Sequence, residues 1–327
     1  CTNAAVKIVM ITGDHPTTAK AIASELGIIS PDNAISDSKS LIVTGYEVEA
    51  MSNADLRRRA QDIRVYARTS PEQKIRIVEA LQANGEFVAM TGDGVNDAPA
   101  LKKADIGVAM GKSGTEVARE ASQLVLLDDN FSTIVVAIRE GRRIFDNIRK
   151  FARYVLTGNS GELWALLLAP LFALPLPLQP IHILFVNLLT DGLPGIALSA
   201  EPAEKNIMQR NPRPPRESIF AHGLWLHALV IGLLLGCITL YSFNLGLHVS
   251  LEHGQTMAFT VLTLGQLFHA LAIRSETQSV LSIGVRSNMQ LLIVIIATWF
   301  IQWLSIYNPF LSQIFGTHPI SKTEYFQ

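Results

Sequence analysis

The chain has 327 residues, of which 27 are Lys or Arg and 28 are Asp or Glu, so its formal net charge is −1. A charge so close to zero argues against a nucleic-acid partner, since nucleic-acid-binding domains carry an excess of basic side chains. The two cysteines, Cys1 and Cys237, are too few to build a disulfide framework.

Charged side chains are concentrated in the first half of the chain. Residues 154–200 contain Glu162 and Asp191 as their only formally charged side chains, and the later apolar runs are equally poor in charge. Uncharged apolar runs of about 20 residues are long enough to cross a bilayer. The sequence therefore predicts a partial soluble domain over residues 1–140 and a membrane domain over residues 141–327.

The first domain alternates strand and helix patterns. Short β-branched, apolar segments predict buried strands, and segments with apolar residues three or four apart predict helices. The predicted strands are residues 6–11, 41–43, 63–67, 87–90, 106–109 and 124–127, and the predicted helices include 17–26 and 72–82. This alternation is typical of an α/β fold with a parallel sheet, helices on both faces, and active groups at the carboxyl ends of the strands.

The most informative segment follows the fourth predicted strand and reads Thr-Gly-Asp-Gly-Val-Asn-Asp over residues 91–97. It places two carboxylates, Asp93 and Asp97, in a glycine-rich turn before a helix. Mg²⁺ prefers oxygen ligands and keeps positions for phosphate oxygens. Glycine lets the backbone approach closely, and a helix N-terminus offers N–H groups to an anion. The segment therefore predicts a magnesium and phosphate site; the alternative is an acidic turn that caps a helix.

This segment resembles the hinge motif of the P-type ATPases, which are cation pumps built on a haloacid-dehalogenase-like phosphorylation domain. Two further segments match the family in order and spacing, namely Thr12-Gly13-Asp14 and the stretch from Arg68 to Lys74. The resemblance implies a Rossmann-type α/β domain followed by an α-helical transmembrane bundle. It also implies that ATP and Mg²⁺ are the cofactors.

The same resemblance implies a role for each matching residue. Thr12 and Gly13 would contact the phosphoryl oxygens, and Asp14 would position the phosphorylation loop. Lys74 would neutralise phosphoryl charge in the transition state, and Arg68 would assist at the nucleotide phosphates. This is phosphoryl transfer by positioning and charge stabilisation.

In the hinge segment, the resemblance implies that Asp93 holds Mg²⁺ together with Asp97 and that Asn96 shapes the nucleotide site. A second glycine-containing segment, Gly-Lys-Ser at 111–113, looks like the end of a P-loop. The earlier glycine that a P-loop requires is replaced by Ile106. We therefore interpret residues 111–113 as a strand-to-helix turn.

The second half of the chain contains five apolar segments that predict membrane spans. They lie near residues 153–174, 181–200, 222–246, 256–273 and 288–307. Lys and Arg gather before the first span, after the second and after the fourth, whereas the loops at the other end lack them. By the positive-inside rule, the soluble domain is cytoplasmic, and the protein is a multi-pass membrane protein in contact with the lipid bilayer.

Polar side chains interrupt two of these spans, each on one helix face. Asn159 and Glu162 are three residues apart, and Asn187, Thr190 and Asp191 follow i, i+3, i+4 spacing. A Gly-Leu-Pro-Gly segment comes next, so we expect a broken helix with free carbonyls. Ionisable groups inside a membrane mark functional sites, and oxygen ligands from two helices suit a hard cation. The alternative is hydrogen bonding that holds the helices together.

These two segments resemble the fifth and sixth transmembrane helices of the calcium pumps, which implies a transported cation, calcium first. Pumps with two calcium sites carry Glu at one position of the eighth helix, where this chain has Gln266. The resemblance implies Gln266 as a further cation ligand, and a neutral ligand there argues against two ions per cycle. The histidines show no metal-ligand spacing, and we interpret them as packing or interfacial residues.

The resemblance covers nearly the whole chain but only the back part of the family's pattern. The Asp-Lys-Thr-Gly-Thr string of the phosphorylated aspartate is absent from these residues. We therefore expect a C-terminal fragment, comprising part of the phosphorylation domain and transmembrane helices five to nine. By itself it would be inactive and would need the missing N-terminal part of the same pump.

The leading hypothesis is ATP-driven cation transport through an aspartyl-phosphate cycle, with calcium as the cation. One alternative is a pump for sodium or manganese. Another is a non-catalytic membrane subunit or decoy that pairs with a complete pump. A phosphatase domain on a membrane anchor would need a pair of aspartates on the first strand, and the sequence has none there.

Overall fold

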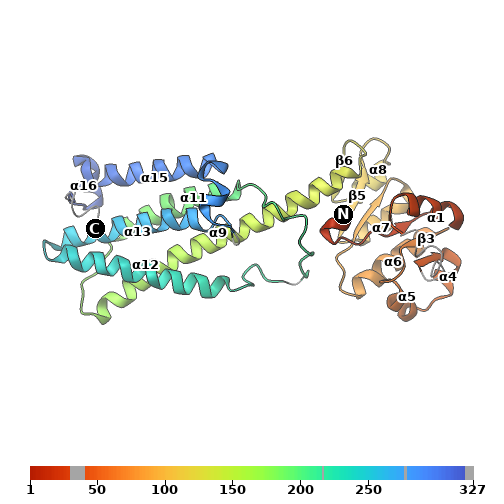
Figure 1. Cartoon of the computed structure of the whole chain (residues 1–327), viewed down its shortest axis with the longest axis horizontal. Coiled ribbons are helices and arrows are strands. Elements are labelled where there is room, and N and C mark those ends of the chain that lie inside the picture. Colours follow the sequence, from red (N-terminus) through yellow and green to blue (C-terminus); the bar gives the residue numbers. More distant parts are fainter. Residues whose placement is uncertain (30–40, 216, 276–277, 321–327) are drawn as a thin grey trace. The chain divides into compact units, whose positions relative to one another are not determined.

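The structure is a computed structural model of the chain that describes residues 1–29, 41–215, 217–275 and 278–320 (Figure 1). It divides into two compact units. The first unit comprises residues 1–139 together with 206–217, and the second comprises residues 140–205 together with 218–327. The predicted membrane domain ends at residue 327, so its last seven residues lie outside the described ranges.

The first unit contains two three-stranded parallel sheets, where the sequence predicts a single sheet. One sheet has the order β1-β3-β2 and the other has the order β4-β5-β6. The strands are β1 (Met10–Ile11), β2 (Ile42–Thr44), β3 (Val65–Ala67), β4 (Ala89–Gly92), β5 (Ile106–Met110) and β6 (Leu124–Leu126). All pairs are parallel, which confirms the α/β, Rossmann-type class.

Side-chain packing, rather than a strand ladder, connects the two sheets. Of the predicted strand 6–11, the structure pairs Met10 and Ile11 with β3. Ile11 packs against the apolar core around Tyr66 and also against the core around Met90 and Leu101. The first strand is therefore too short to extend the hydrogen-bonded ladder, although its last residue belongs to both cores.

Short helices with defined N-caps surround these strands. They are α1 (Pro16–Glu25), α4 (Gly45–Ala50), α5 (Asn53–Arg59), α6 (Pro71–Ala83), α7 (Ala98–Lys103) and α8 (Glu116–Glu120). At the start of α6, the Ser70 hydroxyl accepts from the Gln73 N–H, and the Gln73 side chain accepts from the Ser70 N–H. Such a capping box satisfies two N–H groups that a helix start leaves open. It fixes the first turn of α6, which carries Lys74.

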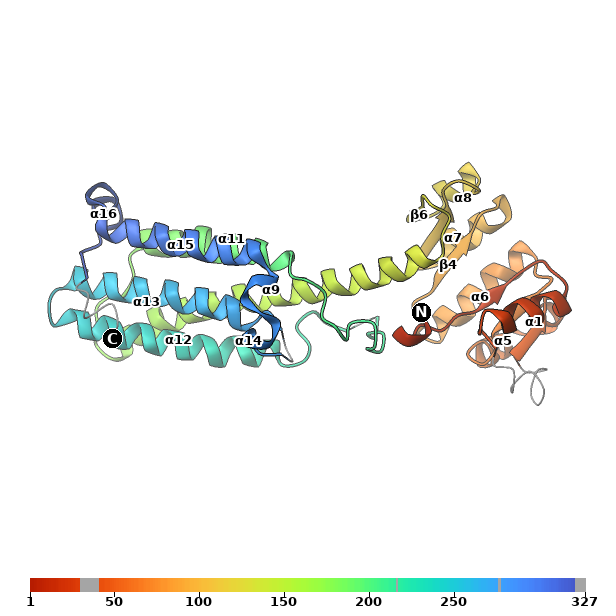
Figure 2. The same ribbon diagram turned by 45° about the horizontal axis from the view of Figure 1, so that its top comes forward.

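The second unit is helical (Figures 1 and 2). Its longer helices are α9 (Ser132–Leu171, which begins in the first unit), α12 (Leu224–Leu247), α13 (Leu251–Ala272) and α15 (Met289–Tyr307). Its shorter segments are α10 (Pro180–Phe185), the π-helix η3 (Val186–Asp191), α11 (Gly192–Ser199), α14 (Val280–Ile283), the 3-10 turn η4 (Val285–Ser287) and α16 (Pro309–Phe315). In its core, His182 stacks on Phe259, and Phe185 meets Phe259 edge to face.

Three helical stretches in the described part of the chain are long and apolar enough to cross a membrane, against five predicted spans. They are Pro180–Ser199, Leu224–Leu247 and Met289–Tyr307. The other two predicted spans lie in α9 and α13. Both helices are rich in buried polar side chains, and these lower their average hydropathy.

Candidate functional site

The Thr12-Gly13-Asp14 turn and Arg68 are brought together by their backbones. The Arg68 N–H donates to the Asp14 carbonyl at 3.1 Å, and the Thr69 N–H donates to the Thr12 carbonyl at 3.1 Å. Arg68 has a φ of 52°, a left-handed conformation that is uncommon for a residue other than glycine. The side chains of Asp14 and Arg68 are exposed at the carboxyl ends of β1 and β3, so they are available to a ligand.

Lys74 and Asp97, 23 residues apart in sequence, form an ion pair. The Lys74 Nζ lies 2.5 Å from Asp97 Oδ1, and the two side chains are 15% and 12% exposed. The second carboxylate oxygen of Asp97 accepts from the Gly94 N–H at 3.3 Å. Both oxygens of Asp97 therefore have protein partners, and Asp97 is placed to orient Lys74.

The hinge segment leaves Asp93 and Asn96 exposed, while Asp97 is buried. The Asp93 carbonyl accepts from the Thr115 N–H at 2.8 Å, which anchors the turn to the start of α8. At Gly92, an added Cβ would lie 2.5 Å from the Cβ of Asp97. Glycine is therefore required at position 92 for Asp97 to lie against the strand end, and the Asp93 carboxylate remains open to a cation.

The Gly111–Ser113 turn binds an acidic side chain of this chain, as expected for a structural turn. The Asp129 carboxylate accepts from the N–H groups of Gly111, Lys112 and Ser113 at 2.7, 2.9 and 2.7 Å. These backbone hydrogen bonds, with that of Lys112 the largest contribution, lower the pKa of Asp129 from 3.8 to about 2. The turn thus provides an anion site that its own aspartate fills.

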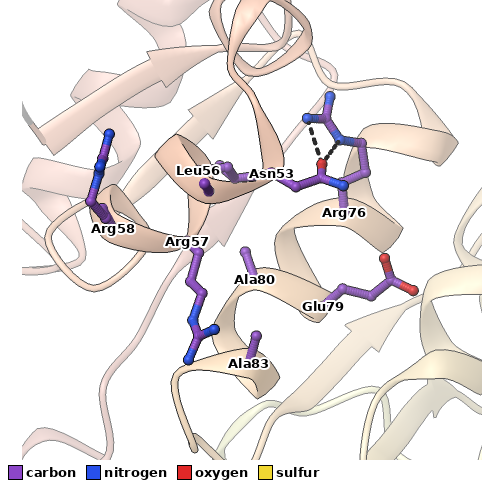
Figure 3. Close-up of a pocket in the computed structure, with 9 residues that line it drawn as sticks. Asn53, Leu56, Arg57, Arg58, Arg76, Glu79, Ala80 and Ala83 are labelled. Carbon is purple, nitrogen blue, oxygen red and sulfur yellow. Dashed lines mark hydrogen bonds between the residues drawn. The ribbon is translucent and has the colours of Figure 1, made fainter.

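A surface pocket in the first unit lies between α5 and α6, away from the predicted site residues (Figure 3). Arg57, Arg58 and Arg76 line it, but each has a partner. Arg76 donates to Asn53 Oδ1 at 3.2 and 3.0 Å, Arg57 donates to Asn84, and Arg58 pairs with Asp55. These contacts already engage all three guanidinium groups, so the pocket lacks the features of a phosphate site.

In the second unit, Glu162, Asp191 and Gln266 meet beside Gly158. The Gln266 Nε2 donates to Glu162 Oε1 at 3.5 Å. A Cβ added at Gly158 would lie 2.9 Å from both Asp191 Oδ1 and Gln266 Nε2, so these groups pack against the glycine. The three side chains are 6%, 4% and 0% exposed.

Several oxygens of this cluster have no hydrogen-bond partner among the described residues. They are Asp191 Oδ1 and Oδ2, Thr190 Oγ1 and Gln266 Oε1. Leaving such groups buried without a partner is costly. Two carboxylates, an amide oxygen and a hydroxyl are ligands that suit a dehydrated hard cation.

The expected helix break near Asp191 is absent; the helix continues through a π-helical segment, η3. Pro194 lacks the N–H that would donate to the Thr190 carbonyl in an α-helix. The Tyr154 hydroxyl donates to that carbonyl instead, at 2.6 Å, and Tyr154 is fully buried. The carbonyl freed by the proline thus already has a partner, which corrects the expectation that it is free for a cation.

Asn159 and Asn187 are exposed in this structure, unlike the other predicted cation ligands. An α-helix would place Asn187 on the same face as Asp191, four residues later. These residues lie in a π-helix, which closes its turns over five residues, so the expected shared face is altered. The structure therefore gathers Glu162, Thr190, Asp191 and Gln266, and it leaves the two asparagines outside the cluster.

A buried ion pair, which we call the Glu201–Arg274 clamp, joins the ends of three helices. Arg274 donates to both Glu201 oxygens at 2.8 to 3.1 Å and also donates to Ser287 Oγ. Asn288 Nδ2 donates to Glu201 Oε2 at 2.8 Å and to the Ala197 carbonyl at 3.0 Å. Sequence reasoning missed this clamp, because Glu201 and Arg274 stand 73 residues apart at span ends, where charges are usually solvated.

Comparison with known proteins agrees with this arrangement of an α/β unit and a helical unit. Residues 2–105 match the haloacid dehalogenase-like hydrolase family, and residues 75–138 match a second model with that description. Residues 175–327 match the family described as cation transporting ATPase, C-terminus. The chain belongs to the P-type cation-transporting ATPases.

Curated relatives in this ATPase family are similar over almost all of the chain. A calcium-transporting ATPase of Bacillus subtilis is 48% identical over 324 residues, which cover 98% of this chain and 36% of the relative. Calcium-transporting ATPase 1 of Bacillus cereus is 42% identical, covering 98% and 37%. The human calcium-transporting ATPase type 2C member 1 is 42% identical, covering 97% and 34%. The chain thus spans about a third of the length of these relatives.

Membership of this ATPase family makes the chain a multi-pass membrane protein.

Two residues of the candidate sites, Gly158 and Tyr154, were not predicted from the sequence to have a role. Gly158 stands three residues before Gly161, a pattern typical of close helix packing, and that spacing was the available signal. Tyr154 gave no signal, since its partner is a backbone carbonyl on another helix.

Proposed function

We propose that the chain forms part of an ATP-driven calcium pump that works through an aspartyl-phosphate cycle. The observation that carries this proposal is the buried cluster of Glu162, Asp191 and Gln266, in which both Asp191 oxygens lack partners within the part of the chain that the structure describes. A buried, uncompensated carboxylate pair is costly unless a cation occupies the site. The names of the relatives describe calcium transport by those proteins, and we extend this assignment to the present chain.

The first unit would supply the phosphoryl-transfer residues. In this proposal the exposed Asp93 carboxylate is the protein ligand of Mg²⁺, and Asp97 orients Lys74 through their ion pair. Mg²⁺ bound there would neutralise charge on the transferring phosphoryl group. Lys74 would stabilise the same charge from the first turn of α6. Asn96 would face the nucleotide from the exposed side of the hinge.

The turn after β1 would hold the phosphate and the segment that carries the phosphorylated aspartate. Thr12 and Gly13 lie at the strand end, where backbone groups can approach phosphoryl oxygens. Asp14 and Arg68 are joined through their backbones, so we propose that they act together at the edge of the nucleotide site. The aspartate itself would come from another part of the full-length protein.

One calcium ion per cycle is the stoichiometry that we propose. The cluster contains two carboxylates, and its third helix contributes the neutral Gln266. Calcium affinity rises with the number of charged ligands, so a neutral amide does not favour a second divalent ion. The positive-inside distribution of Lys and Arg supports a cytoplasmic position for the first unit.

The test is calcium-activated phosphorylation of the full-length pump by ATP. Asp191→Asn should eliminate calcium activation, because it removes a charge from the ligand set without changing shape. Leu188→Ala is the matched control, since Leu188 lies in the same π-helix but is 66% exposed. Sodium and manganese serve as competing ions. Calcium activation that survives Asp191→Asn, or activation of the parent protein by sodium alone, would refute the calcium assignment.

A further inference from the structure

Two stripes of polar side chains run along α13 and α15 inside an otherwise apolar bundle. All of these side chains are at most 5% exposed. On α13 the stripe consists of Thr256, Thr260, Thr263 and Gln266, and on α15 it consists of Thr298, Gln302 and Ser305. Spacings of three and four residues place each set on one helix face.

Contacts at both helix ends show that α13 and α15 lie side by side in opposite directions, with Thr256 and Ser305, the end members of the two stripes, meeting the same loop. At one end, Arg274, which follows α13, donates to Ser287 Oγ, which precedes α15. At the other end, Thr317 donates to the Ser305 carbonyl at 2.5 Å, and the next N–H, that of His318, donates to Thr256 Oγ1 at 3.0 Å. Eighteen residues separate the two anchor points on each helix.

Because helical residues rise equally along each axis, this register fixes which residues are level. Thr263 is level with Thr298, and Gln302 is level with Phe259, one turn nearer the Thr317 end. Gln266, three residues after Thr263, donates to Glu162 in the cation cluster. We call the two stripes together the polar column, which begins at the Thr317–His318 loop and reaches that cluster through Gln266.

The middle of this column has unpaired donors and acceptors. Among the described residues, Gln302 Nε2 and Oε1, Thr263 Oγ1, Thr298 Oγ1 and Gln266 Oε1 have no hydrogen-bond partner. Burying these groups without a partner is unfavourable. The Gln302 amide needs both an acceptor and a donor. A metal ion would satisfy the oxygen but not the N–H group, whereas water satisfies both.

The column is also electrically neutral. Neither the α13 segment 256–266 nor α15 contains Asp, Glu, Lys or Arg. Moving a divalent cation through a buried passage without carboxylates is unfavourable. The chemistry of the lining therefore selects water over the transported ion.

We propose that the two stripes of α13 and α15 hold a file of water that hydrates the cation cluster from the Thr317–His318 side. The inference rests on the proposed function only in naming the cluster as a cation site. The competing explanation is that the stripes are helix-to-helix hydrogen bonds that exclude water. The two explanations differ in whether a polar reagent can enter.

Cysteine accessibility in the full-length pump tests the proposal. Thr298→Cys and Gln302→Cys are introduced separately into a background in which Cys237 and all other cysteines are serine. Each protein is treated with a small, uncharged, polar methanethiosulfonate, with and without calcium, and labelling is followed by mass spectrometry. Ile306→Cys is the matched control, because Ile306 is also fully buried on α15 and lies closer to the Thr317 end.

We expect positions 298 and 302 to react at least tenfold faster than position 306 in at least one of the two conditions. Equal or faster labelling of position 306 would indicate general loosening of the bundle and would overturn the proposal. Absence of labelling at 298 and 302 in both conditions would overturn it too. Calcium-activated phosphorylation of the cysteine-free parent is measured in parallel, so a failure of the calcium assignment is visible separately from the labelling result.

Discussion

The carboxylates of the two candidate sites differ in their exposure and in their hydrogen-bond partners. In the first unit, both oxygens of Asp97 have partners, Lys74 and the Gly94 N–H, and the carboxylate that remains for a ligand is the exposed Asp93. In the second unit, Asp191 is 4% exposed, and both its oxygens lack partners among the described residues. The candidate phosphoryl site is therefore organised by protein contacts, whereas in the proposed function the buried cluster would depend on its ligand for charge compensation.

The second unit also contains a counterexample ten residues after Asp191. Glu201 is equally buried, yet Arg274 and Asn288 satisfy its oxygens. Burial alone therefore does not explain the unpaired oxygens of Asp191. The two carboxylates differ in whether protein groups neutralise or hydrogen-bond them, and substitutions at each type of site can test this difference.

The largest effect on stability is expected at the Glu201–Arg274 clamp. Arg274→Met should lower the free energy of unfolding by about 3–5 kcal/mol, because it leaves the Glu201 carboxylate buried without its counter-charge. Chemical unfolding of the chain in detergent measures this. Arg58→Met is the control, since its pair with Asp55 is exposed and should contribute little to stability. Equal effects of the two substitutions would contradict the clamp's special role.

The next largest effect is expected for Lys74→Ala, on the rate of phosphorylation. Loss of charge stabilisation should raise the barrier to phosphorylation of the full-length pump by about 2–4 kcal/mol, which is a slowing of roughly 30- to 900-fold. Rapid-quench phosphorylation with ATP measures the rate. Lys103→Ala provides the comparison, because Lys103 pairs with Glu79 on the exposed surface. A Lys74→Ala protein that is phosphorylated at the parent rate would show that the ion pair is purely structural.

Gly158→Ala should have a smaller effect, confined to the second unit. The new methyl group would lie 2.9 Å from Asp191 Oδ1 and Gln266 Nε2, so these groups must move apart. We expect about tenfold weaker apparent calcium affinity, which corresponds to about 1.4 kcal/mol. Gly141→Ala in the same helix meets nothing within 4 Å and is the control. Calcium titration of phosphorylation would argue against the cluster geometry if both variants behaved alike.

The smallest effect is expected in the pH dependence of the stability of the first unit. The pKa of Asp129 is lowered to about 2 in the folded protein, compared with 3.8 ordinarily. Its stabilising contribution is therefore fully present above about pH 4 and is lost as the pH falls through 2. Asp129→Asn should melt at a lower temperature than the parent at pH 7, and the difference should shrink as the pH approaches 2. Thermal melts across this pH range test this, and a constant difference would refute it.

Local sequence signals predicted much of the first unit. The β-branched segments and the glycine-rich hinge lie where the pattern placed them, with boundaries shifted by up to four residues. The ion pair between Lys74 and Asp97 could not be predicted from spacing, since α6 and β4 separate the two residues. The division into two sheets depends on β1 pairing at only two residues, which a longer β-branched run did not reveal.

In the second unit, periodicity identified the polar faces but not which of their members meet. Glu162 and Asp191 stood out as isolated charges in apolar spans, and Gln266 was found through its resemblance to a pump helix. The exposure of Asn187 could not be predicted, because the spacing argument assumes an α-helix throughout. The clamp was missed because pairing across 73 residues leaves no local pattern.

The π-helical segment Val186–Asp191 makes the orientation of the candidate cation site depend on the number of residues in this segment. Removing one residue from the segment would restore ordinary α-helical turns and rotate everything on one side of it by about 100° relative to the other. His182 and Phe185, which both contact the Phe259 ring, would then turn away from it, or Asp191 would turn away from Gly158. This segment should therefore tolerate substitutions far better than single-residue deletions.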